Sequence, residues 1–453
     1  MHHDFWTLGR AAKALGLPAY RGTDRAIGSV ATDTRALEPG DLFVALKGER
    51  YDAHEFLRDA VERGAAALVV HDASRVAGTG VPVFVVDDTL HALGALAQFF
   101  RAAWTLPVIA VGGSNGKTST KELLKAALGA RFQVHATTGN LNNQVGTPLT
   151  LLALEPGADC AVVEVGTNMP GEIPLLRAIV APNVVVVTCV QEEHLEGFGD
   201  LAGVLAEESA LLDGAELAIV PATEAGLIAE ARRRARRVVT AGLEAGDVAS
   251  GAHGINGDGT GWLEMEGVRL EVPLRGAHNL RNAMLALAIA REFGIPLADA
   301  ARGMASMPQP PMRSAVEPFG AALLINDAYN ANPGSVRAAL ALLAAVGAGR
   351  QRVAVLGTMR ELGAAAAQLH RDIARTALDS GVDIVAGIGE FRAALEIEGA
   401  GDPRVVLGGD VDDVWPVLQQ RLQPDAAILL KASRGVRLER LLPHLYAWAA
   451  PTP

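Results

Sequence analysis

The stretch VIAVGGSNGKT, residues 108–118, decides the fold of the middle of this chain. Its first four residues are apolar and predict a short buried strand, while Leu123, Leu124 and Leu128 keep the spacing of a following helix. The glycine-rich turn between them lets successive backbone N–H groups point at one anion, and the helix N-terminus adds positive potential. This order of elements predicts a phosphate cradle, although Val111 stands where the first glycine of the GxxxxGK[ST] pattern would fall.

The last two residues of the motif indicate which ligand the cradle binds. Lys117 is expected to reach the outer phosphates of a nucleoside triphosphate, and the Thr118 hydroxyl to bind the accompanying Mg²⁺. The motif indicates a triphosphate but no particular reaction. The nucleotide-binding residues predicted in this loop are Gly113, Ser114, Asn115, Gly116, Lys117, Thr118 and Ser119.

Length and composition limit the class of protein. A chain of 453 residues is too long for one ordinary domain, and about three domains are expected. Half of the residues are hydrophobic and 20% are charged, a composition that builds large cores and is not that of a disordered chain. The net charge of −11 argues against a nucleic-acid partner, and the arginine-rich run at 232–237 is expected to cover the solvated side of a helix.

Cysteine content and hydropathy predict where the chain works. Cys160 and Cys189 are too few for a disulfide framework and fit a reducing compartment. The N-terminal segment lacks the features of a signal peptide, and no window approaches the ~18 apolar residues that a membrane helix needs. We therefore expect a cytoplasmic monomer with no membrane-inserted segment and no nucleic-acid partner.

The succession of helical and strand-like patterns predicts an α/β protein of three domains. Residues 1–105 form a small α/β domain, and residues 106–311 a central P-loop ATPase domain with a mostly parallel sheet. Residues 312–453 alternate strand and helix and predict a Rossmann-like, doubly wound domain. The boundary before it is placed at the PQPP sequence, residues 308–311, because this proline-rich stretch cannot continue a helix.

The expected strands of the two larger domains are apolar without alternation, as in a sheet that is covered on both faces. In the central domain they are residues 108–111, 161–165, 184–188 and 217–220, and in the last domain 322–326, 353–356, 383–386, 404–407 and 427–431. Between residues 247 and 275 the pattern alternates and is rich in glycine, which predicts a small antiparallel insertion.

A carboxylate and an imidazole are expected at the same edge of the central sheet as the phosphate loop. Glu164 closes one predicted strand, and His194 follows another through a short loop. Ligands of open α/β sheets gather at the carboxyl ends of the strands, so the two side chains are candidates to share a divalent cation. Taken alone, each has an ordinary alternative: a solvated strand-end glutamate and a loop histidine without a function.

Three polar segments are candidates for ligand contacts. The loop at 139–146 could be an ordinary turn, but its three asparagines favour contact with a ligand. Asn279 and Asn282 lie one helical turn apart, which suits either helix capping or paired contacts with a nucleotide base. The segment NDAYNANP, residues 326–333, follows a strand, and there Asp327 could accept hydrogen bonds from ribose hydroxyls.

These residues together resemble the Mur ligase family, the ATP-dependent amide-bond ligases of peptidoglycan precursor assembly. The resemblance covers essentially the whole chain and rests on TDTR at 32–35, GDLFVALKGER at 40–50, GNLNN at 139–143, HLEGFG at 194–199 and DAYNANPGS at 327–335. It implies three domains, the cofactors ATP and Mg²⁺, and an acyl-phosphate mechanism. The last motif implies the branch that adds D-alanyl-D-alanine to a UDP-N-acetylmuramoyl tripeptide, because sister ligases usually differ there.

The resemblance also implies roles for particular residues. Lys117 and Thr118 would handle the phosphates and the first Mg²⁺, and Glu164 and His194 would hold the second. The implied catalytic residues are Lys117, Glu164, His194 and Glu208, and the further nucleotide contacts are Asn279, Asn282, Arg313 and Asp327. The implied substrate contacts are Thr34, Arg35 and Lys47 on the uridine-diphosphate side, together with Asn140, Asn143, Tyr329, Asn330 and Asn332.

The chain departs from the family pattern in the helix after HLEGFG. Mur ligases usually carry a carbamylated lysine there, but this helix reads LAEESALL, residues 205–212, and Glu208 aligns with the lysine. We hypothesise that the Glu208 carboxylate supplies the anion directly, without carbon dioxide. Cys189 stands where asparagine is usual. The extra acidic residues Glu192 and Glu193 could recruit metal or face solvent, and we expect them to face solvent.

Two other functions stay open at this point. One is a related enzyme, either a sister ligase that adds a single amino acid or a folylpolyglutamate-type ligase, although the TDTR and FVALKG segments argue against the folate branch. The other is a nucleotide-binding paralogue that has lost ligation, a reading supported only by the missing lysine. The third residue of the acceptor peptide, diaminopimelate or lysine, is not determined by the sequence.

Overall fold

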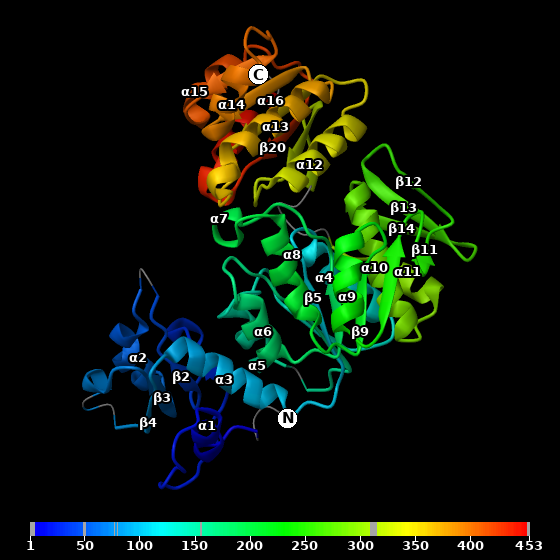
Figure 1. Cartoon of the computed structure of the whole chain (residues 1–453). Coiled ribbons are helices and arrows are strands. Elements are labelled where there is room, and N and C mark those ends of the chain that lie inside the picture. The colour runs from blue at the N-terminus through cyan, green and yellow to red at the C-terminus, as the bar shows by residue number, and fades with distance from the viewer. Residues whose placement is uncertain are drawn as a thin grey trace. The chain divides into compact units, whose positions relative to one another are not determined.

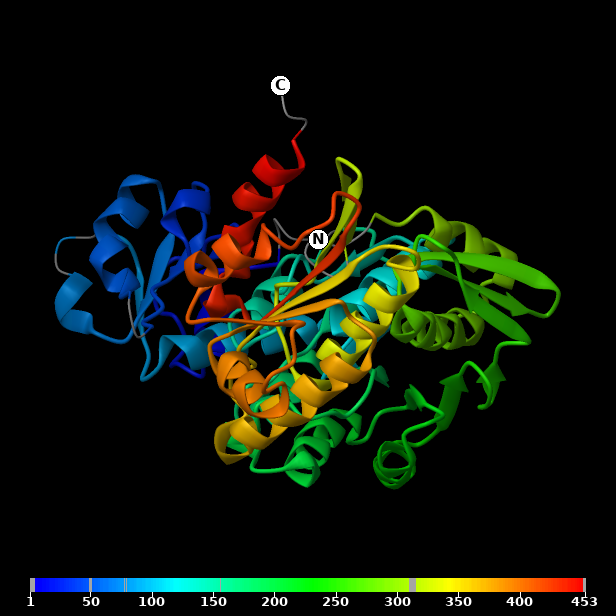
Figure 2. The same cartoon turned by 90° about the horizontal axis from the view of Figure 1, so that it is seen from above.

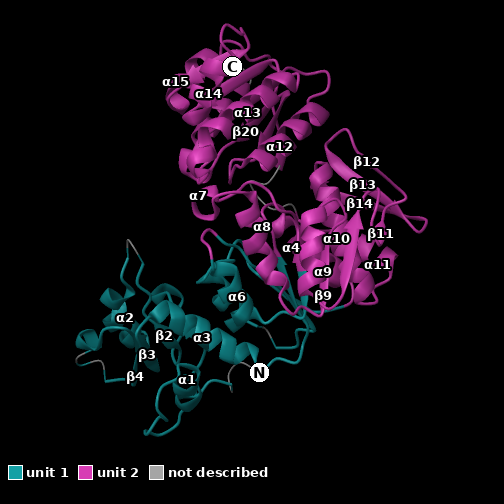
Figure 3. Ribbon diagram, in the orientation of Figure 1, with its two compact units in different colours: residues 1–111, 132–167, 171–185 teal, residues 112–131, 168–170, 186–453 magenta. Residues whose placement is uncertain are grey.

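The computed structural model describes residues 5–48, 51–76, 78, 80–154, 156–308 and 315–450. The chain divides into two compact units, one of residues 1–111, 132–167 and 171–185, the other of residues 112–131, 168–170 and 186–453 (Figure 3). Helices and strands alternate along all three predicted parts of the chain, so the predicted α/β class is confirmed (Figure 1). The division into units crosses the central sheet, and the three predicted domain boundaries therefore stay a prediction.

The N-terminal part of unit 1 is built on a parallel sheet of four strands in the order β1-β2-β3-β4. The strands are β1 Val30–Ala31, β2 Leu42–Val44, β3 Ala67–Val70 and β4 Val83–Val85, and the helices are α1 Leu8–Ala14, α2 Leu57–Glu62 and α3 Thr89–Arg101. Short 3₁₀ turns cover Thr34–Ala36, Ala53–Phe56 and Ala73–Val76. Buried residues of β2 and β3 and the apolar face of α2 form its core.

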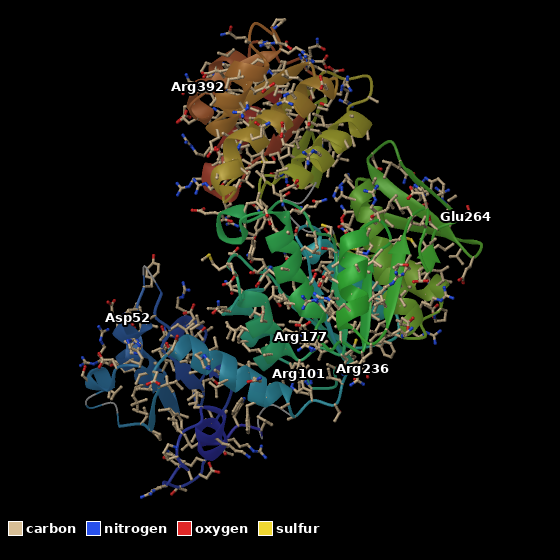
Figure 4. All side chains as sticks on the ribbon, in the orientation of Figure 1. Asp52, Arg101, Arg177, Arg236, Glu264 and Arg392 are labelled. Carbon is tan, nitrogen blue, oxygen red and sulfur yellow. The ribbon has the colours of Figure 1, made fainter. Side chains whose placement is uncertain are left out.

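Helix α3 begins at Thr89 because Asp88 caps it. The Asp88 side chain accepts hydrogen bonds from the backbone N–H groups of Leu90 and His91. At the other end, the Arg101 guanidinium donates to the carbonyls of Val180 and Ala181 at 2.8 Å each, where helix α6 ends (Figure 4). These bonds tie the helix to a neighbouring element of unit 1.

The central sheet has seven strands in the order β11-β10-β9-β8-β5-β7-β6. Its strands are β5 Val108–Gly112, β6 Val134–Ala136, β7 Cys160–Glu164, β8 Val184–Val187, β9 Leu217–Pro221, β10 Val238–Gly242 and β11 Val248–Ala249. The pairings of β5 with β7, β6 with β7, β9 with β10 and β10 with β11 are parallel, as predicted. Strands β6, β10 and β11 were not predicted, because they are short or bounded by charged residues. Strand β11 lies in the segment predicted as an antiparallel insertion, but it pairs in parallel with β10.

The helices around this sheet include the one that follows the glycine loop. They are α4 Lys117–Leu128, α5 Gly146–Leu152, α6 Glu172–Val180, α7 Leu195–Phe198, α8 Leu201–Ser209, α9 Ala225–Arg234, α10 Ala277–Glu292 and α11 Leu297–Ala305. The predicted insertion is confirmed as an antiparallel ribbon of β12 Ala252–Ile255, β13 Thr260–Met265 and β14 Val268–Arg275, the long green arrows of Figure 2. Helix α10 packs against α4 and β14, which places it beside the glycine loop.

The C-terminal sheet has six strands in the order β15-β16-β20-β17-β18-β19. They are β15 Ala315–Phe319, β16 Ala322–Asn326, β17 Arg352–Gly357, β18 Ile384–Ile388, β19 Val405–Gly408 and β20 Ala427–Lys431, with helices α12 Pro333–Val346, α13 Ala366–Asp379, α14 Glu390–Glu398, α15 Val411–Leu418 and α16 Leu442–Ala449. Strand β15 is antiparallel and was not predicted, because it contains Pro318. An edge strand tolerates a proline, which cannot donate to a ladder.

Successive residues of this sheet enter two different cores. Ala354 and Leu356 of β17 belong to one buried cluster, and Val353 and Val355 to the other. A sheet whose alternate side chains are all apolar must be covered on both faces. This is the doubly wound arrangement predicted for the last domain.

No helix among the described residues is long and apolar enough to cross a membrane.

A buried carboxylate in the N-terminal sheet gives a test of local stability. Asp41 accepts hydrogen bonds from the backbone N–H groups of Ser29 and Glu38 at 2.8 and 2.9 Å and from the Ser29 hydroxyl at 2.9 Å. We predict that Asp41→Ala lowers the free energy of unfolding of this part by about 2–4 kcal/mol, because two N–H groups lose their partner. Urea unfolding followed by circular dichroism measures this, with the exposed Asp87→Ala as control; equal stability of the two variants would contradict the assignment.

Candidate functional site

The glycine loop between β5 and α4 is held against two neighbouring elements of unit 2. Gly113 and Gly116 have φ angles of +113° and +85°, which favour glycine. A Cβ at Gly113 would lie 2.3 Å from Thr188 Oγ1, and one at Gly116 would lie 2.8 Å from the amide of Asn282. The predicted strand, glycine loop and helix are therefore confirmed, and neither glycine can be replaced without displacing a neighbour.

The segment that follows β8 runs beside this loop. The backbone N–H of Thr188 donates to Gly112 O at 3.0 Å, and that of Ser114 donates to Cys189 O at 2.9 Å. The Thr188 hydroxyl donates to Asn115 O at 2.5 Å. These bonds continue from the end of β5 to the end of β8, and they hold the backbone of the glycine loop in place.

Lys117 is the first residue of α4, and its side chain bends back over the loop. Its Nζ donates to the carbonyl of Gly113 at 2.5 Å and lies 3.4 Å from that of Ser114. Thr118 and Ser119 follow in the first turn of α4, and both are buried. The positive end of the helix and the ammonium therefore meet over the loop that is predicted to bind phosphates.

Glu208 reaches the same loop from α8. Its Oε2 accepts a hydrogen bond from the backbone N–H of Gly113 at 2.7 Å, and its side chain is 0% exposed. Among the described residues its Oε1 has no hydrogen-bond partner. Burial raises the pKa of this carboxyl to about 7, and Glu193 adds to the rise, whereas Lys117 and the Gly113 N–H group lower the pKa.

Glu193 is a second buried carboxylate near Lys117, and the prediction that it faces solvent is wrong. Its residue is 6% exposed because the chain turns inward at His194, a non-glycine residue with φ of +49°. Burial raises the pKa of Glu193, and the charges of Lys117 and His194 oppose that rise. Glu192, by contrast, is partly exposed.

His194 contacts a residue of the C-terminal sheet domain. Its Nδ1 lies 2.5 Å from Oε2 of Glu361, and its Nε2 lies 3.8 Å from Oε2 of Glu193. The hydrogen bond to His194 holds the pKa of Glu361 below its usual range. Nothing in the sequence indicates this contact, because the two residues are 167 positions apart.

In unit 1, Glu164 ends strand β7, where it is the register partner of Val111. Its backbone N–H donates to Thr137 Oγ1 at 2.9 Å, and its Oε1 accepts from the Asn142 amide at 2.8 Å. Asn142 is thus the member of the asparagine loop that meets the glutamate. The residues of this loop predicted to contact substrate are its neighbours Asn140 and Asn143.

Those neighbours have other surroundings. Asn140 is exposed, and Asn143 Oδ1 accepts from the backbone N–H groups of Val145 and Gly146 at 3.1 and 2.9 Å. That pattern stabilises the start of α5. The substrate roles of both asparagines stay predictions.

Asn279 and Asn282 share one face of α10, as their spacing predicts. Asn282 Nδ2 donates to Asn279 Oδ1 at 3.1 Å, and Asn279 Nδ2 donates to the carbonyl of Arg275 at 2.8 Å. Both are buried, and Asn282 lies against Gly116 of the glycine loop. Burial lowers the pKa of the adjacent His278 to about 4, so this imidazole is neutral at pH 7.

The polar segment after β16 is organised by Lys431, a residue that the sequence argument did not include. Its Nζ lies 2.6 Å from Asp327 Oδ2 and donates to the carbonyl of Asn330 at 2.8 Å. The Arg434 guanidinium lies 5.6 Å from the centre of the Tyr329 ring. In the sequence, the only indication of a role for Lys431 is its position at the end of strand β20.

Asn332 links this segment to the glycine loop. Its Oδ1 accepts from the Ser335 N–H at 2.9 Å and caps α12, while its amide also pairs with that of Asn115, with bonds of 3.0 and 3.1 Å in opposite directions. The side chain predicted to contact substrate is therefore engaged with the protein. Gln191 Oε1 accepts a further bond from Asn115 at 2.8 Å.

The residues predicted for the uridine-diphosphate side lie in the N-terminal sheet domain. Thr34 and Arg35 are in the 3₁₀ turn Thr34–Ala36, and Lys47 forms an isolated bridge with Asp52. Arg35 is exposed and pairs with Asp33, whose pKa it lowers to about 2. Arg313 lies outside the described residues.

No group of three or more His, Cys, Asp or Glu side chains in the described part of the chain is arranged to hold a metal ion. Mg²⁺ that accompanies a nucleotide usually has only one or two carboxylate ligands, with phosphates and water completing its shell. The predicted metal residues Thr118, Glu164 and His194 therefore remain candidates only together with a nucleotide.

Comparison with known families decides the assignment. The Mur ligase family catalytic domain matches residues 26–101, the Mur ligase middle domain matches residues 111–290, and the Mur ligase, glutamate ligase domain matches residues 314–434. The chain belongs to the Mur ligase family.

Individual relatives match this Mur ligase over nearly its whole length. A Bacillus subtilis UDP-N-acetylmuramoyl-tripeptide–D-alanyl-D-alanine ligase is 33% identical over 95% of both chains. The crystal structure of MurF from Acinetobacter baumannii, 30% identical, superposes with a TM-score of 0.88 over 99% of this chain and 100% of that one. A MurF ligase from Thermotoga maritima in complex with ADP is 27% identical, with a TM-score of 0.81 over 93% of this chain and 97% of the other.

The buried carboxyl of Glu208 predicts a pH dependence of stability. Because folding raises its pKa from 4.5 to about 7, the folded state holds this proton more tightly, and stability falls as the pH rises through that window. We predict that the melting temperature of the wild-type chain falls between pH 5 and pH 8 and that Glu208→Gln flattens this fall. Calorimetry at both pH values measures it, with the exposed Glu196→Gln as control; identical slopes in wild type and Glu208→Gln would show that Glu208 titrates normally.

Proposed function

We propose that this Mur ligase uses ATP to join D-alanyl-D-alanine to a UDP-N-acetylmuramoyl tripeptide in peptidoglycan precursor synthesis. The observation that carries the proposal is the full-length match to relatives named for that reaction, at 33% identity in Bacillus subtilis and 35% in Escherichia coli. The motif DAYNANPGS, residues 327–335, favours the same branch of the family.

ATP fits the glycine loop. Gly113 and Gly116 give the loop the positive φ angles of a glycine turn at the N-terminus of α4, and Lys117 holds a positive charge over the loop. The Thermotoga maritima relative, whose structure is a complex with ADP, supports an adenine nucleotide as the ligand. Asn279 and Asn282 would meet adenine from α10, and Asp327 and Arg313 would complete the nucleotide site.

The reaction proceeds in two displacements. The terminal carboxylate of the tripeptide attacks the γ-phosphorus of ATP, the bond to ADP breaks, and an acyl phosphate forms. The dipeptide amine then attacks the acyl carbon, phosphate leaves and the nitrogen loses a proton. Lys117 offsets the charge on the transferred phosphoryl oxygens, and water must be kept away because it would hydrolyse the acyl phosphate.

Mg²⁺ would neutralise phosphate charge when bound with ATP. Thr118, Glu164 and His194 are the side chains that would hold it. A hydroxyl, a carboxylate and an imidazole suit a cation whose other ligands are phosphate oxygens and water. The parallel register of Val111 with Glu164 supports this role, because Val111 leads into the glycine loop.

The proposed substrate contacts fall into two groups, one for the uridine diphosphate and one for the peptide. Thr34, Arg35 and Lys47 would recognise the uridine diphosphate, and the polar loops around Asn140 and Asn330 would recognise the peptide. Tyr329, Asn143 and Asn332 complete this set, although the latter two already have hydrogen-bond partners within the protein.

The domain boundaries we propose are 1–105 for the uridine-nucleotide domain, 106–311 for the ATP-binding domain and 312–453 for the last domain. We place the enzyme in the cytoplasm as a monomer. Two free cysteines agree with a reducing compartment.

Glu208 would take the place of the family's carbamylated lysine. Its carboxyl is buried and accepts a hydrogen bond from the Gly113 N–H group, and its ionised form, which a bound cation would favour, would supply a negative charge at the loop without reaction with carbon dioxide. The missing lysine also favours the alternative of a nucleotide-binding paralogue without ligase activity. The intact Lys117, with its ammonium over the loop, argues for an enzyme.

Phosphate release with defined substrates tests the proposed reaction. We expect ATP-dependent release with UDP-N-acetylmuramoyl tripeptide only when D-alanyl-D-alanine is present, and a loss of at least about 10²-fold in Lys117→Ala, because the transferred charge then lacks its counter-ion. Release with single amino acids would instead indicate a sister ligase. ATP binding without release for any amine would indicate the paralogue.

Replacement of Glu208 tests its role separately. We predict that Glu208→Ala lowers kcat about 10²-fold, while the wild-type rate is the same with and without added bicarbonate. Glu208→Lys restores the residue usual in the family, and its rate should rise with bicarbonate. Wild-type turnover and Mg²⁺ dependence in Glu208→Ala would remove the hypothesis.

A further inference from the structure

Glu361 touches the proposed metal-binding imidazole from a different domain. It lies in the segment after β17, whereas His194 precedes α7 of the central domain, and both belong to unit 2. Their side chains meet at 2.5 Å between Oε2 and Nδ1. A second bond joins the same segments, because the Glu196 N–H donates to the Glu361 carbonyl at 3.1 Å.

The contact favours one tautomer of His194. Nδ1 and the Glu361 carboxylate oxygen lie 2.5 Å apart without the alignment of a regular hydrogen bond, and two lone pairs would repel at that distance, so the proton is favoured on Nδ1. The other nitrogen, Nε2, lies 3.8 Å from Glu193 Oε2, beyond hydrogen-bond distance. This tautomer leaves a lone pair on Nε2.

The segment that carries Glu361 is held in a costly conformation. Glu361 and His194 both have positive φ angles, +65° and +49°, a backbone conformation that is unfavourable for a residue with a Cβ. A Cβ at Gly363 would lie 3.0 Å from the Glu196 Cα, so the two segments approach closely. Strain of this kind persists only where the surroundings impose it.

Those surroundings are a buried histidine and a serine. His370 Nε2 accepts from the Met359 N–H at 2.9 Å, and its Nδ1 donates to the Ala366 carbonyl at 2.7 Å. The Ser433 hydroxyl accepts from the Arg360 N–H at 3.0 Å. The backbone on the N-terminal side of Glu361 is therefore fixed at two consecutive residues.

We propose that Glu361 is a positioning residue that orients His194 for a divalent cation. The inference rests on the proposed function in one respect, the metal role of His194. The carboxylate keeps the proton on Nδ1 and presents Nε2 to the cation, as carboxylate–histidine pairs do in metal sites. Because Glu361 comes from the last domain, docking of that domain onto the central one completes the site.

Metal binding by the full-length chain tests the proposal. Mn²⁺ replaces Mg²⁺ as the probe, and free Mn²⁺ is counted by electron paramagnetic resonance in the presence of a non-hydrolysable ATP analogue. We expect His194→Ala and Glu361→Ala each to weaken Mn²⁺ binding about 10–100-fold, and the double variant to lose no more than His194→Ala alone. Glu361→Gln, whose amide oxygen still accepts from Nδ1, should stay within about 5-fold of wild type, and the exposed Glu396→Gln is the matched control.

A spectroscopic readout separates positioning from folding. In ¹⁵N-histidine spectra without metal, the wild-type His194 should show Nε2 as the unprotonated nitrogen, and Glu361→Ala should show a mixture of tautomers at an unchanged melting temperature. Normal Mn²⁺ binding or an unchanged tautomer in Glu361→Ala would overturn the positioning role of Glu361 and leave the metal role of His194 intact. Normal Mn²⁺ binding in His194→Ala would overturn the metal role of His194 and this inference together.

Discussion

The site depends on one steric constraint, the absence of space around the glycine loop. Gly113 lies against Thr188, and Gly116 lies against Asn282, so the loop backbone has a single path between β5 and α4. That path brings the N-terminus of α4 and the Lys117 ammonium together over the glycine loop. Because the loop cannot relax, the groups bonded to it keep fixed positions as well.

The electrostatics of the site follow from that close packing. Glu208 and Glu193 are both buried near a single lysine, and burial raises the pKa of each. Burial disfavours the charged form of a carboxylate unless cations are close. A nucleotide with its divalent cation would change this balance, since the cation adds positive charge where two carboxylates now share one ammonium.

Polar side-chain contacts join the central and C-terminal domains within unit 2, in addition to the backbone bond from Glu196 to Glu361. Asn115 pairs with Asn332, and His194 pairs with Glu361. Each contact connects a loop at a strand end of one sheet with a loop at a strand end of the other. Side chains from separate domains thus bear directly on the phosphate loop and on the candidate metal ligand, which gives domain docking a chemical consequence.

The amino-acid sequence by itself determined the α/β class, the glycine loop, the antiparallel insertion and most strands, because apolar runs and glycines act locally. It also named Lys117, Glu164 and His194 as candidate site residues by type and position, and Glu208 through the family resemblance; their roles stay predictions. It did not reveal Asn142, Lys431 or the Glu361 contact, and it placed Glu193 wrongly in solvent. Burial and pairing between residues distant in sequence are set by the packing of whole elements, so only the tertiary structure decided them.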